Sequence, residues 1–121
     1  MSYLKQLVLR NRSVRRFDQR QVISRDELCE LVDYTRYCAS AANRQPLLYC
    51  LSWAAQRNAA IFDCLAWAGY LPDWPGPVEG ERPAAYIVIL ADQAISKNIW
   101  CDDGIAAQTI LLAATERGWG G

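Results

Sequence analysis

The sequence contains no histidine among its 121 residues. A Ser-His-Asp or Cys-His catalytic relay is therefore excluded, and so is a zinc site of the usual His/Cys type. No run approaches the roughly 18 apolar residues of a membrane span, and the N-terminus lacks the apolar stretch of a secretory signal. We predict a soluble, cytoplasmic protein with no metal site and no membrane contact.

An excess of one charge is also missing, because Lys plus Arg and Asp plus Glu number 13 each. No global field selects nucleic acid, and the one basic stretch lacks interleaved aromatics and a groove-reading helix. We therefore expect no nucleic-acid partner. The five cysteines are odd in number and form no CxxC pair. They indicate reduced thiols, as in a cytosolic protein.

Aromatic and apolar residues are abundant: 52% of the chain is apolar, with five Trp and six Tyr. A chain of this length forms one domain that buries about two thirds of its unfolded surface. The richness suits either a dense core or a core continued across a subunit interface, and we favour the second.

The spacing of apolar residues predicts four helices and two strands. Ser24 and Glu27 form a capping box, which predicts a helix start worth about 1 kcal/mol. Both strands are apolar on both faces, which predicts a central first strand and a buried second one. The helix near residue 60 should bury Ile61, Leu65 and Ala68. The expected helices are 2–9, 24 to 38 or 39, 54–68, and 104–117, the last of them opened by Asp102 or Asp103. The expected strands are 47–53 and 84–91. Residues 69–83 should form a loop, and Gly118 should follow the last helix.

Two short polar segments stand out in this apolar chain: residues 12–17 and residues 40–46. The first offers guanidinium forks and a hydroxyl, which suit a phosphate dianion. The second clusters hydroxyl and amide groups, which suit the edge of a heteroaromatic ring. Together they indicate a site for a phosphorylated cofactor. From the residues alone, a solvated basic face and a loop that satisfies its own backbone remain alternatives.

Six motifs in order resemble the nitroreductase family of FMN-dependent oxidoreductases. They are Asn11-Arg12-Ser13-Val14-Arg15-Arg16-Phe17, Ala39-Ser40-Ala41-Ala42-Asn43-Arg44-Gln45-Pro46, Trp67-Ala68-Gly69-Tyr70, Gly80-Glu81-Arg82-Pro83, the strand 84–91, and Asp102-Asp103-Gly104-Ile105-Ala106-Ala107-Gln108 leading into Gly118-Trp119-Gly120-Gly121. The resemblance covers nearly the whole chain.

The resemblance implies a single α+β domain over residues 1–121: a nitroreductase-like sandwich with a central, mostly antiparallel sheet flanked by helices, in an interlocked homodimer with FMN at the interface. By this likeness Arg12 and Arg15 hold the FMN phosphate, with Ser13 close to the phosphate or ribityl chain. Ser40, Asn43 and Gln45 meet the isoalloxazine edge or ribityl hydroxyls, some of them across the interface.

The implied function is an FMN-dependent oxidoreductase that uses NADH or NADPH in a ping-pong cycle. Hydride passes from the nicotinamide to the flavin, and then to a small-molecule acceptor such as a nitroaromatic or a quinone. Absence of histidine agrees with this, since FMN carries the redox chemistry itself. No catalytic side chain can be named. Trp67, Tyr70 and Trp74 either line the substrate side of the flavin or anchor the loop.

The chain departs from the family at Gly121, where nitroreductases continue with a further segment. We therefore expect a truncated chain that lacks the C-terminal segment of the fold. The alternative function is a non-catalytic flavin-binding or assembly module on the same scaffold.

Overall fold

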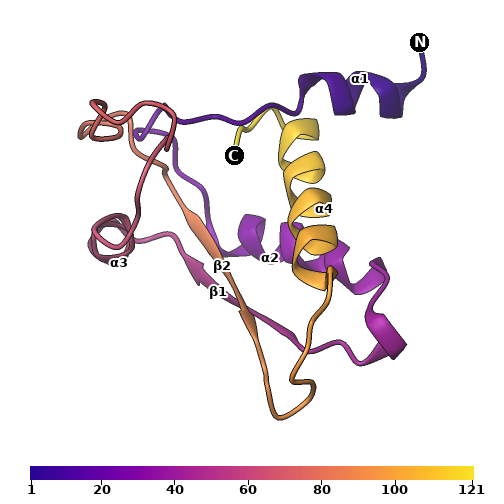
Figure 1. Cartoon of the computed structure of the whole chain (residues 1–121). Helices are drawn as coiled ribbons and strands as arrows, with labels where there is room; N and C mark the ends of the chain where they lie inside the picture. The colour runs from indigo at the N-terminus through magenta and orange to yellow at the C-terminus, as the bar shows by residue number, and fades with distance from the viewer.

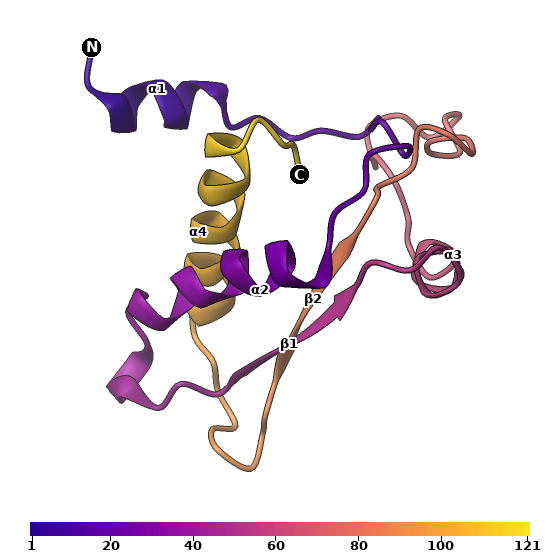
Figure 2. The same ribbon diagram turned by 180° about the vertical axis from the view of Figure 1, so that it is seen from behind.

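The computed structural model describes all residues, 1–121, and consists of four α-helices, two short 3-10 helices and a two-stranded sheet (Figure 1). In chain order these are α1 (Tyr3–Arg10), α2 (Arg25–Asp33), η1 (Tyr34–Tyr37), η2 (Ala41–Asn43), β1 (Leu47–Ser52), α3 (Ala55–Phe62), β2 (Tyr86–Ala91) and α4 (Asp102–Glu116). The longest element, α4, stands between α1 at one end and the η1–η2 region at the other (Figures 1 and 2). Helix α3 lies on the far side of the sheet from α4.

Capping residues set the helix boundaries much as the sequence predicts. The Ser2 side chain accepts from the Lys5 amide at the start of α1, and the Ser24–Glu27 capping box is complete at the start of α2. Gly118 follows α4 with a φ of 81°, a left-handed conformation that favours glycine. These local signals require only a few neighbouring residues, so they can be identified without the fold.

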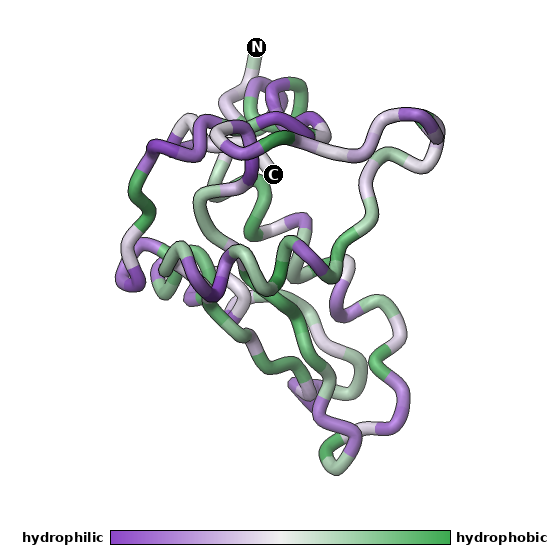
Figure 3. Tube along the Cα trace, turned by 90° about the vertical axis from the view of Figure 1, so that its left-hand side faces the viewer, coloured by the Kyte–Doolittle hydropathy of each residue, from purple (hydrophilic) through white to green (hydrophobic).

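The two strands pair antiparallel, with Leu47 opposite Ala91 and Ser52 opposite Tyr86. Apolar residues follow one another along both strands, as Figure 3 shows. The predicted central position of the first strand is nevertheless wrong, because β1 and β2 pair only with each other. Alternation of apolar residues predicts which faces could be covered but not whether another strand lies alongside.

Burial along the strands is also lower than predicted. Leu48 and Leu90 are each about half exposed, and Tyr86 to Ile89 are only half-buried. One face of the sheet packs on the helices, where Tyr49 and Ile87 contact the core of Leu31, Ile110, Ala113 and Ala114. Only 14 of the 121 residues are buried, so the core of the single chain is small.

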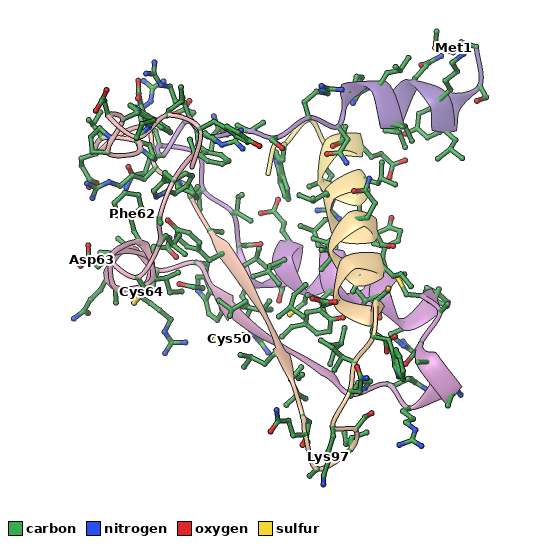
Figure 4. All side chains as sticks on the ribbon, in the orientation of Figure 1. Met1, Cys50, Phe62, Asp63, Cys64 and Lys97 are labelled. Carbon is green, nitrogen blue, oxygen red and sulfur yellow. The ribbon has the colours of Figure 1, made fainter.

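Helix α3 is shorter than the predicted 54–68. It ends at Phe62, Leu65 is exposed, and Ala68 has a left-handed φ of 43°. The chain turns back because Trp67 packs against Phe62, with ring centroids 5.8 Å apart. Phe62 lies at the end of α3 below the loop (Figure 4). The predicted helix to residue 38 or 39 likewise changes at Tyr34 into the 3-10 helix η1.

Candidate functional site

The basic segment between residues 10 and 20 contains five arginines, of which three have partners within the chain. Arg10 donates to the Thr115 carbonyl (2.7 Å). Arg20 pairs with Asp18 (3.0 Å), which lowers the pKa of that carboxyl through hydrogen bonds from the Arg20 side chain and backbone. Arg16 lies 3.9 Å from a Glu81 carboxylate oxygen and over the Trp74 ring.

The other two arginines, Arg12 and Arg15, make no ion pair or hydrogen bond within the chain and are exposed, as is Ser13 between them. The backbone that carries them is held at two points. The Val14 amide donates to the Gly121 carbonyl (3.0 Å), and the Phe17 amide donates to the Glu81 carbonyl (2.8 Å). Two free guanidinium groups on a backbone held by these two hydrogen bonds can bind an anion without breaking an existing pair.

The second polar segment, residues 40–45, is a tight loop with an unusual backbone. Ala42, Asn43 and Gln45 all have φ near +51°, in the left-handed region that non-glycine residues rarely adopt. The Gln45 Nε2 donates to Asn43 Oδ1 (2.9 Å), so the two amides lie side by side and exposed. Each retains free hydrogen-bonding groups, since Gln45 keeps its carbonyl oxygen and Asn43 keeps its amide N–H groups.

Ser40, the third predicted residue of this loop, points inward instead. Its Oγ–H donates to Asp102 Oδ2 (2.5 Å), and the same oxygen accepts from the backbone amide of Gln45 (3.0 Å). The Ala41 amide donates to the other Asp102 oxygen (3.1 Å). Asp102 therefore connects the loop to the first turn of α4.

Sequence reasoning gave Asp102 no role beyond opening the helix. The two adjacent acids differ in burial, since Asp102 is 5% exposed and Asp103 is exposed. The signal that could have identified Asp102 is an acidic residue at a helix start together with an upstream Ser. That pattern is common, and the contact is concealed because Ser40 and Asp102 are 62 positions apart in the sequence.

The structure does not bring the two polar segments together. Arg10 and Val14 contact the C-terminal end of α4 and the residues beyond it, whereas Ser40 contacts Asp102 at the N-terminal end. With 15 residues, α4 is about 22 Å long. Figure 2 shows the same separation, with residues 12–17 beyond one end of α4 and η2 near the other.

The three aromatic residues of the long loop do not form a common surface. Trp67 packs on Phe62 with its indole N–H buried and without a partner, Tyr70 is fully exposed, and Trp74 lies below Arg16 at 5.7 Å. Gln19 also holds the loop, because its side-chain Oε1 accepts from the Gly80 backbone amide (2.7 Å). Within one chain, Trp67 therefore anchors the loop.

An apolar cavity of about 320 Å³ lies between α2, α4, β2 and the C-terminal residues. Tyr86 is the one titratable side chain among its lining residues, and burial raises the pKa of that phenol. Such a lining can hold an apolar body but offers no general base near neutral pH. No group of three or more His, Cys, Asp or Glu side chains is placed to hold a metal ion. None of the helices combines the length and the hydropathy needed to cross a bilayer.

Comparison with known proteins gives matches among solved structures alone, since no family model and no curated protein matches the sequence. A structure from Parabacteroides distasonis, named as an NADH dehydrogenase/NAD(P)H nitroreductase, is 21% identical with a TM-score of 0.76. The match covers 98% of this chain and 65% of the Parabacteroides chain. One of the same name from Bacteroides thetaiotaomicron is 19% identical with a TM-score of 0.75, over 98% of this chain and 64% of its own.

A nitroreductase from Desulfovibrio desulfuricans, solved in complex with FMN, is 21% identical with a TM-score of 0.72, over 97% of this chain and 64% of its own. This chain thus spans slightly less than two thirds of the length of these three proteins. At this level of identity the likeness establishes the fold. The chain has the α+β nitroreductase fold that the order of its motifs predicted.

Proposed function

We propose that this chain, with its nitroreductase fold, binds FMN as a homodimer and transfers reducing equivalents from NADH or NADPH to a small acceptor. The observation that carries the proposal is the state of the basic segment. Arg10, Arg16 and Arg20 have partners, while Arg12 and Arg15 have none. These two are the arginines that the sequence motif assigns to the FMN phosphate.

The donor set fits the two chemically different ends of FMN. Two guanidinium groups and the Ser13 hydroxyl suit a phosphate dianion, because charge-assisted hydrogen bonds are the strongest type available. The exposed amides of Asn43 and Gln45 offer both donors and acceptors, as the polar edge of a flavin ring requires. The cavity of about 320 Å³ adds apolar surface but no competing charge.

The separation of the two polar segments supports the homodimer. One chain holds them near opposite ends of α4, a helix about 22 Å long. In a two-fold symmetric dimer the basic segment of one chain can meet the 40–45 loop of its partner, and this creates two equivalent sites. The small core and the exposed apolar strand residues support the same arrangement, because a second chain would cover them.

When bound, FMN supplies the hydride and electron chemistry. The chain's own residues then have three tasks: Arg12 and Arg15 neutralise the phosphate, Asn43 and Gln45 orient the ring edge, and the apolar lining excludes water. No side chain needs to act as a general base. The acceptors that suit this site are flat and electron-poor, such as nitroaromatics and quinones.

A second candidate is a flavin-binding or assembly module without turnover. The nitroreductase fold that the chain shares with the compared structures fits this candidate as well as the first. The two candidates agree on the FMN site and differ only in whether a nicotinamide reduces the bound flavin.

The experiment that tests the proposal is FMN titration followed by anaerobic addition of NADH or NADPH, monitored by visible absorption. We expect a bound flavin spectrum that bleaches with a nicotinamide. Bound flavin that stays oxidised would select the module, and a protein that binds no FMN would refute both candidates.

The site itself is tested by Arg12→Ala combined with Arg15→Ala. Each charge-assisted contact contributes about 1.5–3 kcal/mol, so FMN affinity should fall about 10²- to 10⁴-fold while the fold persists. Arg25→Ala combined with Arg57→Ala removes the same charge from two exposed positions outside the proposed site and should leave the affinity within about threefold. Equal losses of FMN affinity in both double variants would show that the effect comes from net charge and not from a site at Arg12 and Arg15.

A further inference from the structure

The Asp102 carboxylate is buried at the start of α4 and has no cationic partner. It is 5% exposed, and its two oxygens accept from the Ser40 hydroxyl (2.5 Å) and the Ala41 amide (3.1 Å). A buried carboxylate is costly unless hydrogen bonds satisfy it, and the first turn of a helix adds a favourable dipole. Both of its hydrogen bonds come from the 40–45 loop, so the loop and the carboxylate hold each other in place.

Ser40 transmits this hold to the far end of the loop. A hydroxyl has one proton to donate, and here Ser40 donates it to Asp102. The Ser40 oxygen accepts from the backbone amide of Gln45. Two donor–acceptor steps therefore connect Asp102 to Gln45. Because its proton is already committed, Ser40 cannot also donate to a ligand.

The loop needs such a restraint, because its backbone is locally unfavourable. Ala42 and Gln45 are left-handed non-glycine residues, a conformation that clashes with Cβ, and Asn43 between them is also left-handed. Within the loop itself, only the Asn43 amide to the Ser40 carbonyl (2.9 Å) and the Arg44 amide to the Ala41 carbonyl (3.2 Å) close backbone turns. A loop free of Asp102 would relax to commoner conformations.

We propose that Asp102 is a positioning residue that acts through Ser40. It holds the loop so that the side-chain amides of Asn43 and Gln45 are placed to meet the flavin. The inference rests on the proposed function for its ligand. It also changes the assignment of Ser40 from a flavin contact to the link between Asp102 and Gln45. Asn43 and Gln45 are then the direct contacts from this loop.

The main test measures FMN affinity and the visible spectrum of bound FMN for Ser40→Ala and Ser40→Thr. Ser40→Ala should weaken FMN binding about tenfold and shift the absorption bands of the flavin. The reason is that the loop loses its link to Asp102, so the side-chain amides at the ring edge are no longer fixed. Ser40→Thr keeps a hydroxyl at an extended backbone position (φ −137°, ψ 138°) that suits a β-branched residue, so affinity and spectrum should return to within about threefold of wild type.

Asp102→Asn tests the source of the restraint, and Asp103→Asn is its matched control. The amide has only one acceptor oxygen for the two donors, so FMN should weaken about tenfold or more. The exposed Asp103→Asn should stay within about twofold. Adding Ser40→Ala to Asp102→Asn should weaken binding no further, because both changes break the same chain of hydrogen bonds.

Amide hydrogen exchange of the FMN-free protein separates failure of this inference from failure of the proposed function. Exchange at Gln45 should accelerate in Ser40→Ala and recover in Ser40→Thr, whether or not FMN binds. Wild-type protein that protects Gln45 but binds no FMN overturns the proposed function and the flavin role of Asp102 with it. Ser40→Ala that keeps wild-type affinity and spectrum overturns the positioning role alone, and this remains decisive if Asp102→Asn does not fold.

Discussion

Two variants that each lose FMN should together regain half of the sites when they share a dimer. One variant carries Arg12→Ala and Arg15→Ala, and the other carries Asn43→Ala and Gln45→Ala. If each site joins the basic segment of one chain to the 40–45 loop of the other, the mixed dimer has one doubly altered site and one intact site. The separation of the two segments along the 15 residues of α4 is the structural reason to expect this.

The expected size follows from the contacts removed. Loss of two charge-assisted contacts should weaken FMN about 10²- to 10⁴-fold, whereas loss of two neutral amide contacts, at about 0.5–1.5 kcal/mol each, should weaken it about 5- to 150-fold. At an FMN concentration that saturates only intact sites, each parent dimer should bind little flavin. The mixed dimer should bind about one FMN per two chains, against about two for wild type.

The assay is co-expression of the two variants with different affinity tags, sequential purification on both tags, and flavin absorbance per mole of dimer. A doubly tagged wild-type dimer calibrates the stoichiometry. A mixed dimer that binds no flavin would refute the shared site, because both segments would then have to come from one chain. Failure to recover any doubly tagged species, with the wild type included, would refute the homodimer.

Three further variants test the surroundings of the site. Gly120→Ala would place a Cβ 2.6 Å from a methyl carbon of the β-branched Val14, so we expect a loss of about 1–3 kcal/mol in the free energy of unfolding, with Val14→Ala restoring part of it in urea titrations. Gln19→Ala removes the acceptor of the Gly80 amide, and hydrogen exchange should rise at that amide while overall stability falls by about 1 kcal/mol. Leu31→Ala should cost about 2–5 kcal/mol by thermal or chemical unfolding, because Leu31 is 4% exposed in the core; a smaller loss would mean that the core collapses around the gap.

Local features of the fold could be predicted from the sequence because short-range physics determines them. The capping box of Ser24 and Glu27, the irregular loop at 69–83 and the glycine after α4 each depend on a few adjacent residues. The fold itself was predicted from six motifs in order and agrees with the solved structures. The roles of the predicted site residues remain predictions.

Features that depend on distant residues could not be predicted. The buried contact between Ser40 and Asp102 spans 62 residues, and nothing near either residue distinguishes it from an ordinary loop serine and an ordinary helix-start acid. Arg16 likewise has partners that are distant in sequence. These are Glu81 and Trp74 of the long loop, 65 and 58 residues further on. The sequence predicted an arginine cluster, and only the structure separates its free members from its paired ones.

The lower burial of the strands bears on the proposed dimer. Apolar side chains at Leu48 and Leu90 predict that something covers them, yet within one chain both remain about half exposed. The pattern therefore describes a surface for which this chain provides no cover. The separated polar segments pose the same problem in chemical terms, since each would supply half of the proposed site. A second copy that covers the apolar surface and brings its own 40–45 loop to Arg12 and Arg15 would resolve both, which is why the mixed-dimer experiment tests the fold and the function together.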